Sequence, residues 1–344
     1  MWIIGCDFHP GFQQVAIFDN QTGEVQEKKL HHPGEAIEFY RSLEGAVLVG
    51  MEAGSPCQWF RRLLQDCGHQ LWIGDAGRIR AAETRRQKTD RRDAELILRL
   101  MLEGRFPRIW VPTESERDVR QLLMDRHHRM RMRTRVKNQL QSLAMNQGLQ
   151  KGRRLWSQAG LQQLRDLPMM EHAGRRRDQL LQTMAALDEQ IAALDRLVRS
   201  EAEARVEARR LMTHPGVGPQ TALAMVLTLG EVSRFAGSKQ VASYLGLTPR
   251  EHSSGGKQRL GHISKQGSSF LRFLLVEAGQ TAVRGDEQLR RAYLRLAAKK
   301  SRALAKVMVA RRLAIRLYWM LRQQWDYTEL ARHAGKPGSF RGER

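Results

Sequence analysis

Four carboxylates in the sequence stand where they could bind divalent metal ions. Asp7 and Glu52 each end a short apolar run with the character of a buried strand. Asp90 and Asp93 are three residues apart at the start of a helical pattern, so both project from one face of that helix. Mg²⁺ prefers oxygen ligands, and two such ions about 4 Å apart support phosphoryl transfer. These four acids are therefore the predicted catalytic and Mg²⁺-binding residues.

The same acids also have an ordinary explanation. A carboxylate at a strand end is often a turn residue, and one in the first turn of a helix interacts favourably with the helix dipole. Glu52 is the strongest case for function, because the run VLVGME reaches it without a turn residue. Asp75 follows another predicted strand in a similar way, and we rank it below the other four.

A second group of side chains is suited to a polyanion. The stretch 252–276 contains five serines, four glycines and four cations but no carboxylate. Glycines let the backbone approach a phosphate closely, while hydroxyls and cations add donors and positive charge. The adjacent Ser253 and Ser254 could supply a nucleophile, and a flexible basic loop without chemistry is the alternative. The predicted phosphate contacts in this stretch are Lys257, Arg259, Lys265 and Arg272.

Charge is distributed unevenly along the chain. The net charge is +22, yet residues 1–75 contain 5 Lys or Arg against 10 Asp or Glu, a net −5. The remaining residues therefore carry +27 and are expected to attract nucleic acid. A carboxylate-rich catalytic domain joined to a nucleic-acid-binding body is the simplest interpretation.

Cysteine use and hydropathy indicate the compartment. Cys6, Cys57 and Cys67 form no CxxC pair, which indicates a reducing compartment and no zinc site. No apolar run approaches the roughly 18 residues of a membrane helix, and the opening MWIIGCDFHP is too short and too acidic for a signal peptide. We therefore expect a cytoplasmic, nucleoid-associated protein with no membrane partner.

The elements that must position the first acids form a mixed α/β pattern. Strands are predicted at 2–6, 14–18, 24–31, 46–51 and 70–73. Helices are predicted at 34–43 and 57–67, and another helix starts near Asp90. Site residues of an open α/β sheet usually lie where strands leave the core, as Asp7 and Glu52 would.

The middle of the chain is predicted to be helical. A long helical pattern covers 114–146, and its segment 126–137 holds six cations, among them Arg129 and Arg133, that we expect to contact phosphates. A connector broken by glycines follows at 148–174. Residues 175–212 then show an apolar seam at helical spacing, which predicts a coiled-coil arm and a dimer.

The C-terminal third is also predicted to be mostly helical. The segment HPGVGPQTA lies between two helical stretches, so Gly216 and Gly218 could expose backbone N–H groups that hold a DNA phosphate. An ordinary helix turn is the alternative. Further helices are predicted at 238–244, 271–281 and 288–325, and the tail from His333 is expected to be disordered.

The motifs GCDFHP, GMEAGSP, KTDRRDAELI, HPGVGPQTA and GLTPREHSSGGKQRLGHISKQGSSFLR together resemble those of DEDD-type insertion-sequence transposases, the IS110 family, which also includes the Piv-type DNA invertases. The resemblance covers nearly the whole chain, and the C-terminal motif is highly specific. It implies an α/β domain followed by α domains. The implied domains are a RuvC-like (RNase H-like) DEDD catalytic domain at 1–147, a connector and coiled-coil arm at 148–210, a transposase domain with a helix-hairpin-helix and the serine loop at 211–327, and a flexible tail at 328–344.

The resemblance also implies a chemistry and a set of partners. The four acids would bind Mg²⁺, and a serine that forms a phosphoserine intermediate with DNA would be Ser253, with Ser254 as the alternative. A structured non-coding bridge RNA would pair with donor and target DNA, and the protein would act as a homodimer or homotetramer with a site composed from two subunits. His9 departs from the family pattern, in which small or β-branched residues and lysine are commoner near this position, and it becomes a candidate participant.

The resulting prediction is an RNA-guided DNA recombinase that excises and inserts a mobile element. A site-specific invertase of the same fold is one alternative. A metal-dependent junction nuclease, in which the acids do all the chemistry and the serine loop only binds, is another. A non-catalytic nucleic-acid-binding protein that has kept the fold is the third.

Overall fold

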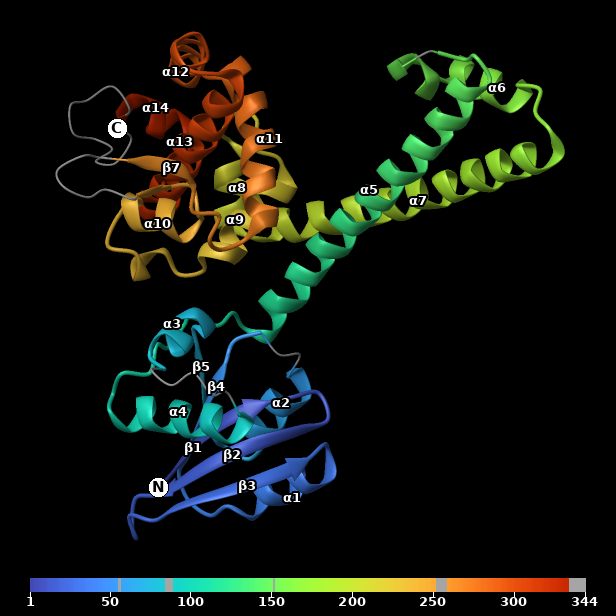
Figure 1. The fold of residues 1–344 in the computed structure, drawn as a ribbon. Coiled ribbons are helices and arrows are strands. Elements are labelled where there is room, and N and C mark those ends of the chain that lie inside the picture. Colours follow the sequence, from blue (N-terminus) through green and yellow to red (C-terminus); the bar gives the residue numbers. More distant parts are fainter. Residues whose placement is uncertain (55–56, 84–88, 151, 252–258, 334–344) are drawn as a thin grey trace. The chain divides into compact units, whose positions relative to one another are not determined.

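The structure is a computed structural model that describes residues 1–54, 57–83, 89–150, 152–251 and 259–333 (Figure 1). The chain divides into two compact units, Met1–Val111 and Pro112–Arg344. The first is built around a mixed sheet, and the second is mostly helical. Each unit is described separately below.

The first unit contains a five-stranded sheet in the order β3-β2-β1-β4-β5. β1 pairs antiparallel with β2 and parallel with β4, while β2 pairs antiparallel with β3 and β4 parallel with β5. This mixed sheet confirms the predicted strands and is consistent with the RuvC-like domain that the resemblance implies. The strands are β1 (Trp2–Phe8), β2 (Phe12–Asp19), β3 (Val25–His31), β4 (Val47–Glu52) and β5 (Gln70–Gly74).

Helices cover both faces of this sheet, because side chains alternate between the two faces along each strand. Ile4 and Cys6 of β1 share a buried cluster with residues of α1 (Gly34–Ser42) and α2 (Gln58–Asp66). The other face of β1 and β2 packs against α4 (Asp90–Leu102). A short helix that the sequence did not predict, α3 (Ala76–Ala81), follows β5.

Two glycines allow α4 to lie unusually close to the sheet. A Cβ added at Gly5 would stand 2.3 Å from the carbonyl oxygen of Ala94 and 2.5 Å from the amide nitrogen of Leu98. A Cβ at Gly50, on the neighbouring strand β4, would stand 2.2 Å from the sulfur of Met101. The backbone of α4 therefore rests directly on β1 at Gly5, while side chains of α4 fill the space above Gly50 of β4.

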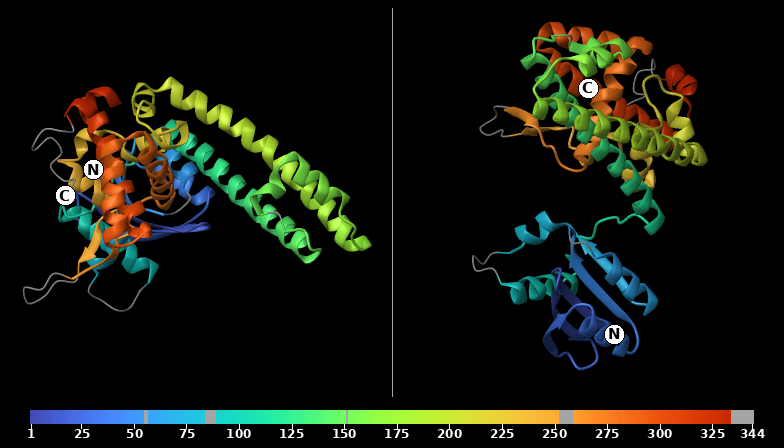
Figure 2. Two further views of the ribbon diagram at one scale, coloured as in Figure 1. Left: turned by 90° about the horizontal axis from the view of Figure 1, so that it is seen from above. Right: turned by 90° about the vertical axis from the view of Figure 1, so that its right-hand side faces the viewer.

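The second unit begins with a pair of long helices, α5 (Glu114–Asn146) and α7 (Glu171–Ala204), which cross in Figure 1 and are seen to lie side by side in the left view of Figure 2. The predicted connector between them contains a short 3₁₀ turn, η1 (Gly152–Trp156), and a helix that was not predicted, α6 (Gln158–Asp166). Leu155 and Leu164 from these elements are buried against both long helices. The connector is therefore part of a small core rather than a loose link.

The predicted apolar seam lies on α7, where side chains of α5 from the same chain pack against much of it. Met184 and Leu187 of α7 are buried in one cluster with Val136 and Leu140 of α5. The helical run predicted over 175–212 is also interrupted at Arg205, where α7 ends and α8 (Val206–Met212) begins. Because this seam is filled within one chain, the dimer stays a prediction.

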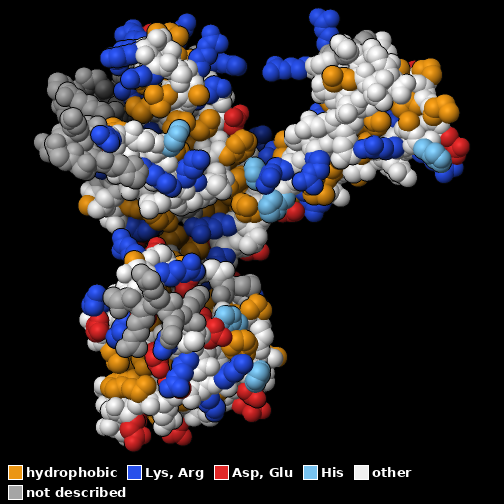
Figure 3. Space-filling model, in the orientation of Figure 1, with side chains coloured by type: hydrophobic (Ala, Val, Ile, Leu, Met, Phe, Trp, Pro, Cys, Tyr) orange, Lys and Arg blue, Asp and Glu red, His pale blue; other side chains and the backbone are white. Residues whose placement is uncertain are grey.

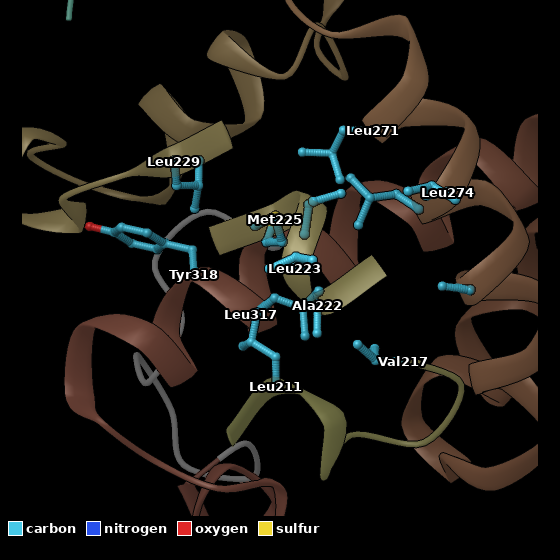
Figure 4. Close-up of a cluster of buried hydrophobic side chains, with 14 of the residues drawn as sticks. Leu211, Val217, Ala222, Leu223, Met225, Leu229, Leu271, Leu274, Leu317 and Tyr318 are labelled. Atoms are coloured by element: carbon cyan, nitrogen blue, oxygen red, sulfur yellow. The ribbon is translucent and has the colours of Figure 1, made fainter. Parts of the chain in front are cut away.

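Most of the remaining helices of the second unit surround one large core (Figure 4), while α12 packs in a separate small cluster. Side chains from α8, α9, α11 and α13, including Leu211, Leu223, Leu271 and Leu317, meet there. The helix predicted over 288–325 is divided in two at Lys300 and Ser301, and Ser301 caps the second part. The elements are α9 (Pro219–Leu229), η2 (Val232–Arg234), α10 (Ser238–Tyr244), α11 (Ser269–Gly285), α12 (Glu287–Lys299), α13 (Arg302–Gln323) and α14 (Tyr327–His333).

Two further features differ from the prediction. Short strands β6 (Pro249–Glu251) and β7 (Leu260–Ile263) pair as an antiparallel hairpin on either side of the predicted serine loop. Residues 328–333, predicted as part of a flexible tail, belong to α14, whose Leu330 is fully buried. Residues 334–344 of that tail lie outside the described residues.

The first compact unit ends at Val111, whereas the predicted catalytic domain ran to residue 147. The difference is α5, which directly follows the sheet unit in sequence but packs along α7. Within the described parts of the chain, no helix is both long enough and apolar enough to cross a membrane.

Replacing Gly5 with alanine tests the close packing of α4 on the sheet. We expect Gly5→Ala to cost about 1–3 kcal/mol of local stability, because the methyl group meets backbone atoms that cannot rotate away. Amides of α4 should then exchange with deuterium roughly tenfold faster or more, as measured by mass spectrometry. Gly11→Ala is the control, since nothing lies within 4 Å of a Cβ there. Equal exchange of α4 in the two variants would contradict the close packing.

Candidate functional site

The first turn of α4 brings an acid to the end of β1. Asp7 lies near the end of β1, and α4 starts at Asp90, with Thr89 as its N-cap. His9 stands between the two acids. Its Nε2 lies 3.1 Å from Oδ2 of Asp7 and 3.5 Å from Oδ1 of Asp90. The imidazole ring stacks on Phe12, with ring centroids 4.8 Å apart, which holds it in this position.

Burial and neighbouring charge both act on Asp7. Burial raises the pKa of the Asp7 carboxyl above its ordinary value, and the nearby carboxylates of Asp93 and Asp90 add to the rise. His9 opposes this rise through its charge and its hydrogen bond. Three acids therefore interact electrostatically at this end of the sheet, with one imidazole offsetting part of their repulsion.

Glu52 lies on the adjacent strand but faces a different partner. Cys6 of β1 pairs with Met51 of β4, so Asp7 and Glu52 follow neighbouring positions of two parallel strands. The Glu52 carboxylate accepts a hydrogen bond from Nη2 of Arg80 at 3.1 Å. A role for Arg80 was not predicted, although the basic run that contains it is visible in the sequence.

The donor set at this end of the sheet suits a divalent cation. Among the residues that the structure describes, Asp7, His9 and Asp90 have ligand atoms that all lie within 4.8 Å of one another. Two carboxylate oxygens and one imidazole nitrogen are common ligands of divalent metals, with imidazole favouring transition metals over Mg²⁺. The predicted ligands Asp7 and Asp90 thus belong to one group, while Glu52 and Asp93 do not join it in this arrangement. Asp75, ranked below these acids, is the N-cap of α3, where it accepts a hydrogen bond from the amide of Arg78.

The hairpin β6–β7, which stands on either side of the predicted serine loop, is anchored at its base. Ser253, Ser254 and Lys257 lie outside the described residues. On the flanks, Gly246 and Gly267 both have positive φ, and a Cβ at Gly246 would stand 2.3 Å from the carbonyl oxygen of Gln266. The chain on the two sides of the hairpin therefore packs backbone against backbone.

The three described cations of this stretch differ in their surroundings. The Arg272 guanidinium donates to the carbonyl oxygens of Leu245, Gln266 and Gly267, so it ties the base of the hairpin together. Arg259 and Lys265 are exposed, and Lys265 has a positive φ of 58°. Arg272 is therefore already engaged by the protein, and phosphate binding by all three cations stays a prediction.

The segment HPGVGPQTA forms the turn between α8 and α9, as predicted. Gly216 is required for packing, because its φ is +81° and a Cβ would stand 2.5 Å from the amide nitrogen of Ala282 in α11. Gly218 is exposed, caps α9 and has nothing within 4 Å of a Cβ position. Only Gly218 therefore has open space beside it for a phosphate.

The arginines predicted as phosphate contacts on α5 have partners on the arm itself. Arg129 donates to the side-chain oxygen of Gln190 on α7 at 2.5 Å, and it also pairs with Asp125 of its own helix. Arg133 forms an ion pair with Asp188 of α7. These contacts join the two arm helices, and a role of Arg129 and Arg133 in nucleic-acid binding stays a prediction.

Comparisons with known proteins agree on one family. The sequence matches the family model described as "Transposase IS116/IS110/IS902 family" over residues 208–295. It also matches the DEDD transposase model of the IS110 group, described as "Transposase", over residues 4–146. The two matches cover both compact units, and the second extends across α5.

Similar individual proteins carry related names. The chain is 29% identical to a "Probable family 20 transposase" of Pseudomonas aeruginosa over 288 residues, which is 82% of this chain and 84% of that protein. It is 29% identical to the "Transposase for insertion sequence element IS1111A" of Coxiella burnetii over 286 residues, or 82% and 78% of the two chains. It is 28% identical to the "Pilin gene-inverting protein" of Moraxella lacunata over 173 residues, or 49% and 45%.

Removing the imidazole tests whether it belongs to the metal-binding group. We expect His9→Ala to weaken Mn²⁺ binding by about tenfold or more, because one of three ligand atoms is lost. Isothermal titration calorimetry measures the affinity directly. His31→Ala is the matched control, since His31 is exposed at the end of β3 and lies outside the group. Unchanged affinity in His9→Ala would exclude the imidazole as a ligand.

Buried His214, in the turn before α9, should make the fold sensitive to acid. Its Nδ1 donates to the Pro215 carbonyl oxygen at 2.9 Å, and burial lowers the pKa of the imidazole from 6.5 to about 4. Between pH 6.5 and 4 the unfolded chain takes up a proton that the folded chain does not, so stability falls as the pH falls.

The size of this effect can be measured against a variant that does not titrate. Between pH 7.5 and pH 5 we expect the wild type to lose about 2 kcal/mol more stability than His214→Phe. Urea unfolding at the two pH values measures both losses. Equal losses would show that His214 does not control the acid sensitivity.

Proposed function

The chain belongs to the IS116/IS110/IS902 family of transposases, and from that premise we propose that it breaks and rejoins DNA to excise and insert a mobile element under the guidance of an RNA. The observation that carries the proposal is the convergence of Asp7, His9 and Asp90, from β1 and α4, into one group of potential metal ligands. An acidic site of this kind at the end of an open sheet suits chemistry on a phosphodiester.

Asp7 and Asp90 would hold a divalent cation, with Mg²⁺ as the expected ion, and His9 would join as a further ligand when the ion is a transition metal such as Mn²⁺. When bound, the cation neutralises charge that develops on the phosphate. Asp7 of β1 and Asp90 of α4 would orient the cation, since β1 and α4 pack closely at Gly5. Asp93, which acts electrostatically on Asp7, and Glu52, which Arg80 holds at 3.1 Å, would complete the DEDD set once the acids rearrange around the cation.

The proposed nucleophile is Ser253, with Ser254 as the alternative. Its hydroxyl oxygen would form a bond to the phosphorus and lose its proton, while a DNA hydroxyl leaves and takes up a proton. A hydroxyl from another strand would then attack the phosphoserine ester and release the serine. The number of phosphodiester bonds is unchanged, so the reaction exchanges strands without hydrolysis. Lys257, Arg259 and Lys265 would stabilise the charge on the phosphate.

The proposed partners are donor DNA, target DNA and a structured bridge RNA that pairs with both. The strongly basic composition supports contact with both nucleic acids. The acids and the serine stretch belong to different compact units, which supports a site composed from two subunits of a dimer or tetramer. A cytoplasmic position at the nucleoid completes the proposal.

A DNA invertase is the second candidate. The partial similarity to a "Pilin gene-inverting protein" favours it, although that similarity covers 49% of this chain. The two reactions share strand breakage and rejoining and differ in their DNA sites. A reporter with inverted copies of the element's ends would distinguish inversion from excision.

A circular-junction assay tests the proposal in cells that carry the gene with its native flanking DNA. We expect a junction with the wild type, and at least about a hundredfold less with Ser253→Ala or Asp7→Asn, because each removes a group that acts in the transition state. Polymerase chain reaction across the junction measures the yield.

Matched variants make this assay specific. Ser254→Ala and Asp66→Asn should form the junction at close to the wild-type yield, because Ser254→Ala keeps the proposed nucleophile Ser253 and Asp66 is an exposed acid at the end of α2. A junction in Ser253→Ala but not in Ser254→Ala would identify Ser254 as the nucleophile. A junction that persists when Ser253→Ala and Ser254→Ala are combined would show that neither serine is the nucleophile and would favour metal-activated water, followed by attack of the freed DNA hydroxyl on the other strand.

A further inference from the structure

Helix α12 carries an unusually basic outer face. Leu289 and Ala292 are buried, and Tyr293 packs with Leu289 against Val309 of α13. The opposite side is exposed, and Figure 3 shows Lys and Arg side chains gathered over the region where Figure 1 labels α12. The exposed cations of α12 and of the turn into α13 are Arg290, Arg291, Arg295, Lys299, Lys300 and Arg302, here called the α12 surface.

The spacing of these cations arranges them in a line. Arg291, Arg295 and Lys299 are four residues apart, so they follow one another along one side of the helix. Each step of four residues advances about 6 Å along the axis. Like charges at this spacing repel one another and destabilise an isolated helix by a few tenths of a kcal/mol per pair. A polyanion lying along the helix would remove that repulsion.

Few acids compete for these cations. From Arg284 to Lys306 the chain contains two carboxylates, Asp286 and Glu287. Asp286 is buried and pairs with Arg316 at 2.5 Å, so it does not reach the surface. Glu287 pairs with Arg291 at 2.8 Å. Within the described stretch 259–333, no ion pair engages the other five cations.

The basic run 126–137 of the arm has ion pairs at three of its six cations, Arg126, Arg129 and Arg133. Arg126 of α5 pairs with Asp195 of α7 at 2.5 Å, and Arg133 pairs with Asp188. The α12 surface has comparable cation density but only one such pair. Leu294 is also 56% exposed among these cations, so an apolar contact is available beside the charges.

We propose that the α12 surface binds the phosphates of a nucleic-acid double helix without reading its bases. Residues 289–302 contain no Asn, Gln, Asp or Glu that could pair with a base beside these cations, which favours contact with the phosphate backbone over sequence recognition. The inference deepens the proposed function by naming the surface that holds the duplex while the acids and the serine act elsewhere. The phosphate chemistry is shared by DNA and RNA duplexes.

Salt dependence of binding tests this surface in the full-length protein. Fluorescence anisotropy gives the affinity for a DNA duplex of about three helical turns at several salt concentrations. The slope of log affinity against log salt is negative, and each lost phosphate contact reduces its magnitude by about 0.9. When three cations are removed together, we therefore expect the magnitude of the slope to fall by roughly 2 to 3. The test variant combines Arg290→Gln, Arg295→Gln and Lys299→Gln.

A control variant removes the same charge from elsewhere. The control combines Arg41→Gln, Arg165→Gln and Arg199→Gln, three exposed positions on α1, α6 and α7. Glutamine is a good helix former, so both variants should retain their helices. The proposal is supported if the magnitude of the slope, relative to the wild type, falls by less than about 1 in the control and by about 2 or more in the test variant. Equal slopes in the two variants would overturn it.

Other ligands separate the sources of phosphate. The same measurement with an RNA duplex shows whether the surface holds DNA, RNA or both, and a loss with either one supports phosphate binding. If the test variant loses affinity for vesicles of anionic phospholipid but for neither duplex, the surface binds membranes and the proposal is wrong.

Failure of this inference is distinguishable from failure of the proposed function. Asp7→Asn should bind the duplex with the wild-type salt slope while forming no circular junction. If the wild-type chain forms no junction, the proposed function is contradicted, but the salt slopes still test the α12 surface. A test variant that binds like the wild type would contradict only the role of the α12 surface.

Discussion

The close contact between α4 and the sheet is the constraint on which the metal-binding group depends. Without a side chain at Gly5 the backbone of α4 reaches β1, and without one at Gly50 the Met101 side chain of α4 packs onto β4. The first turn of α4 then lies beside the end of β1. Asp90 is thereby held near Asp7 although 83 positions separate them in the sequence. Apolar contacts of Ala94 and Leu98 with Ala16 support this placement and oppose the repulsion between the acids.

Local patterns predicted much of this fold. Short apolar runs bounded by turn residues revealed strands of the sheet, and the bounds of α5 and α10 agree with those predicted. Patterns of this kind depend on neighbours in sequence, which is why they also placed Asp7 and Glu52 at strand ends. The hairpin β6–β7 was missed because its strands are short and exposed and lack alternation.

Partners distant in sequence could not be predicted. Arg80 faces Glu52 from a helix that was not anticipated, and Arg133 meets Asp188 across the arm. A charge run in a sequence looks the same whether its partners lie on another helix or in solution. The second unit shows both outcomes, since Arg126 and Arg133 of the arm pair with acids of α7 while most cations of α12 are exposed.

Crystals of the protein soaked with Mn²⁺ would test the central claim most directly, because anomalous scattering locates the ion independently of activity. A peak within about 2.5 Å of carboxylate oxygens from both Asp7 and Asp90 is the predicted result. It would show that the packing of α4 on Gly5 and Gly50 creates a metal site from two elements. A peak bound by strand residues alone, or none at this end of the sheet, would contradict that claim.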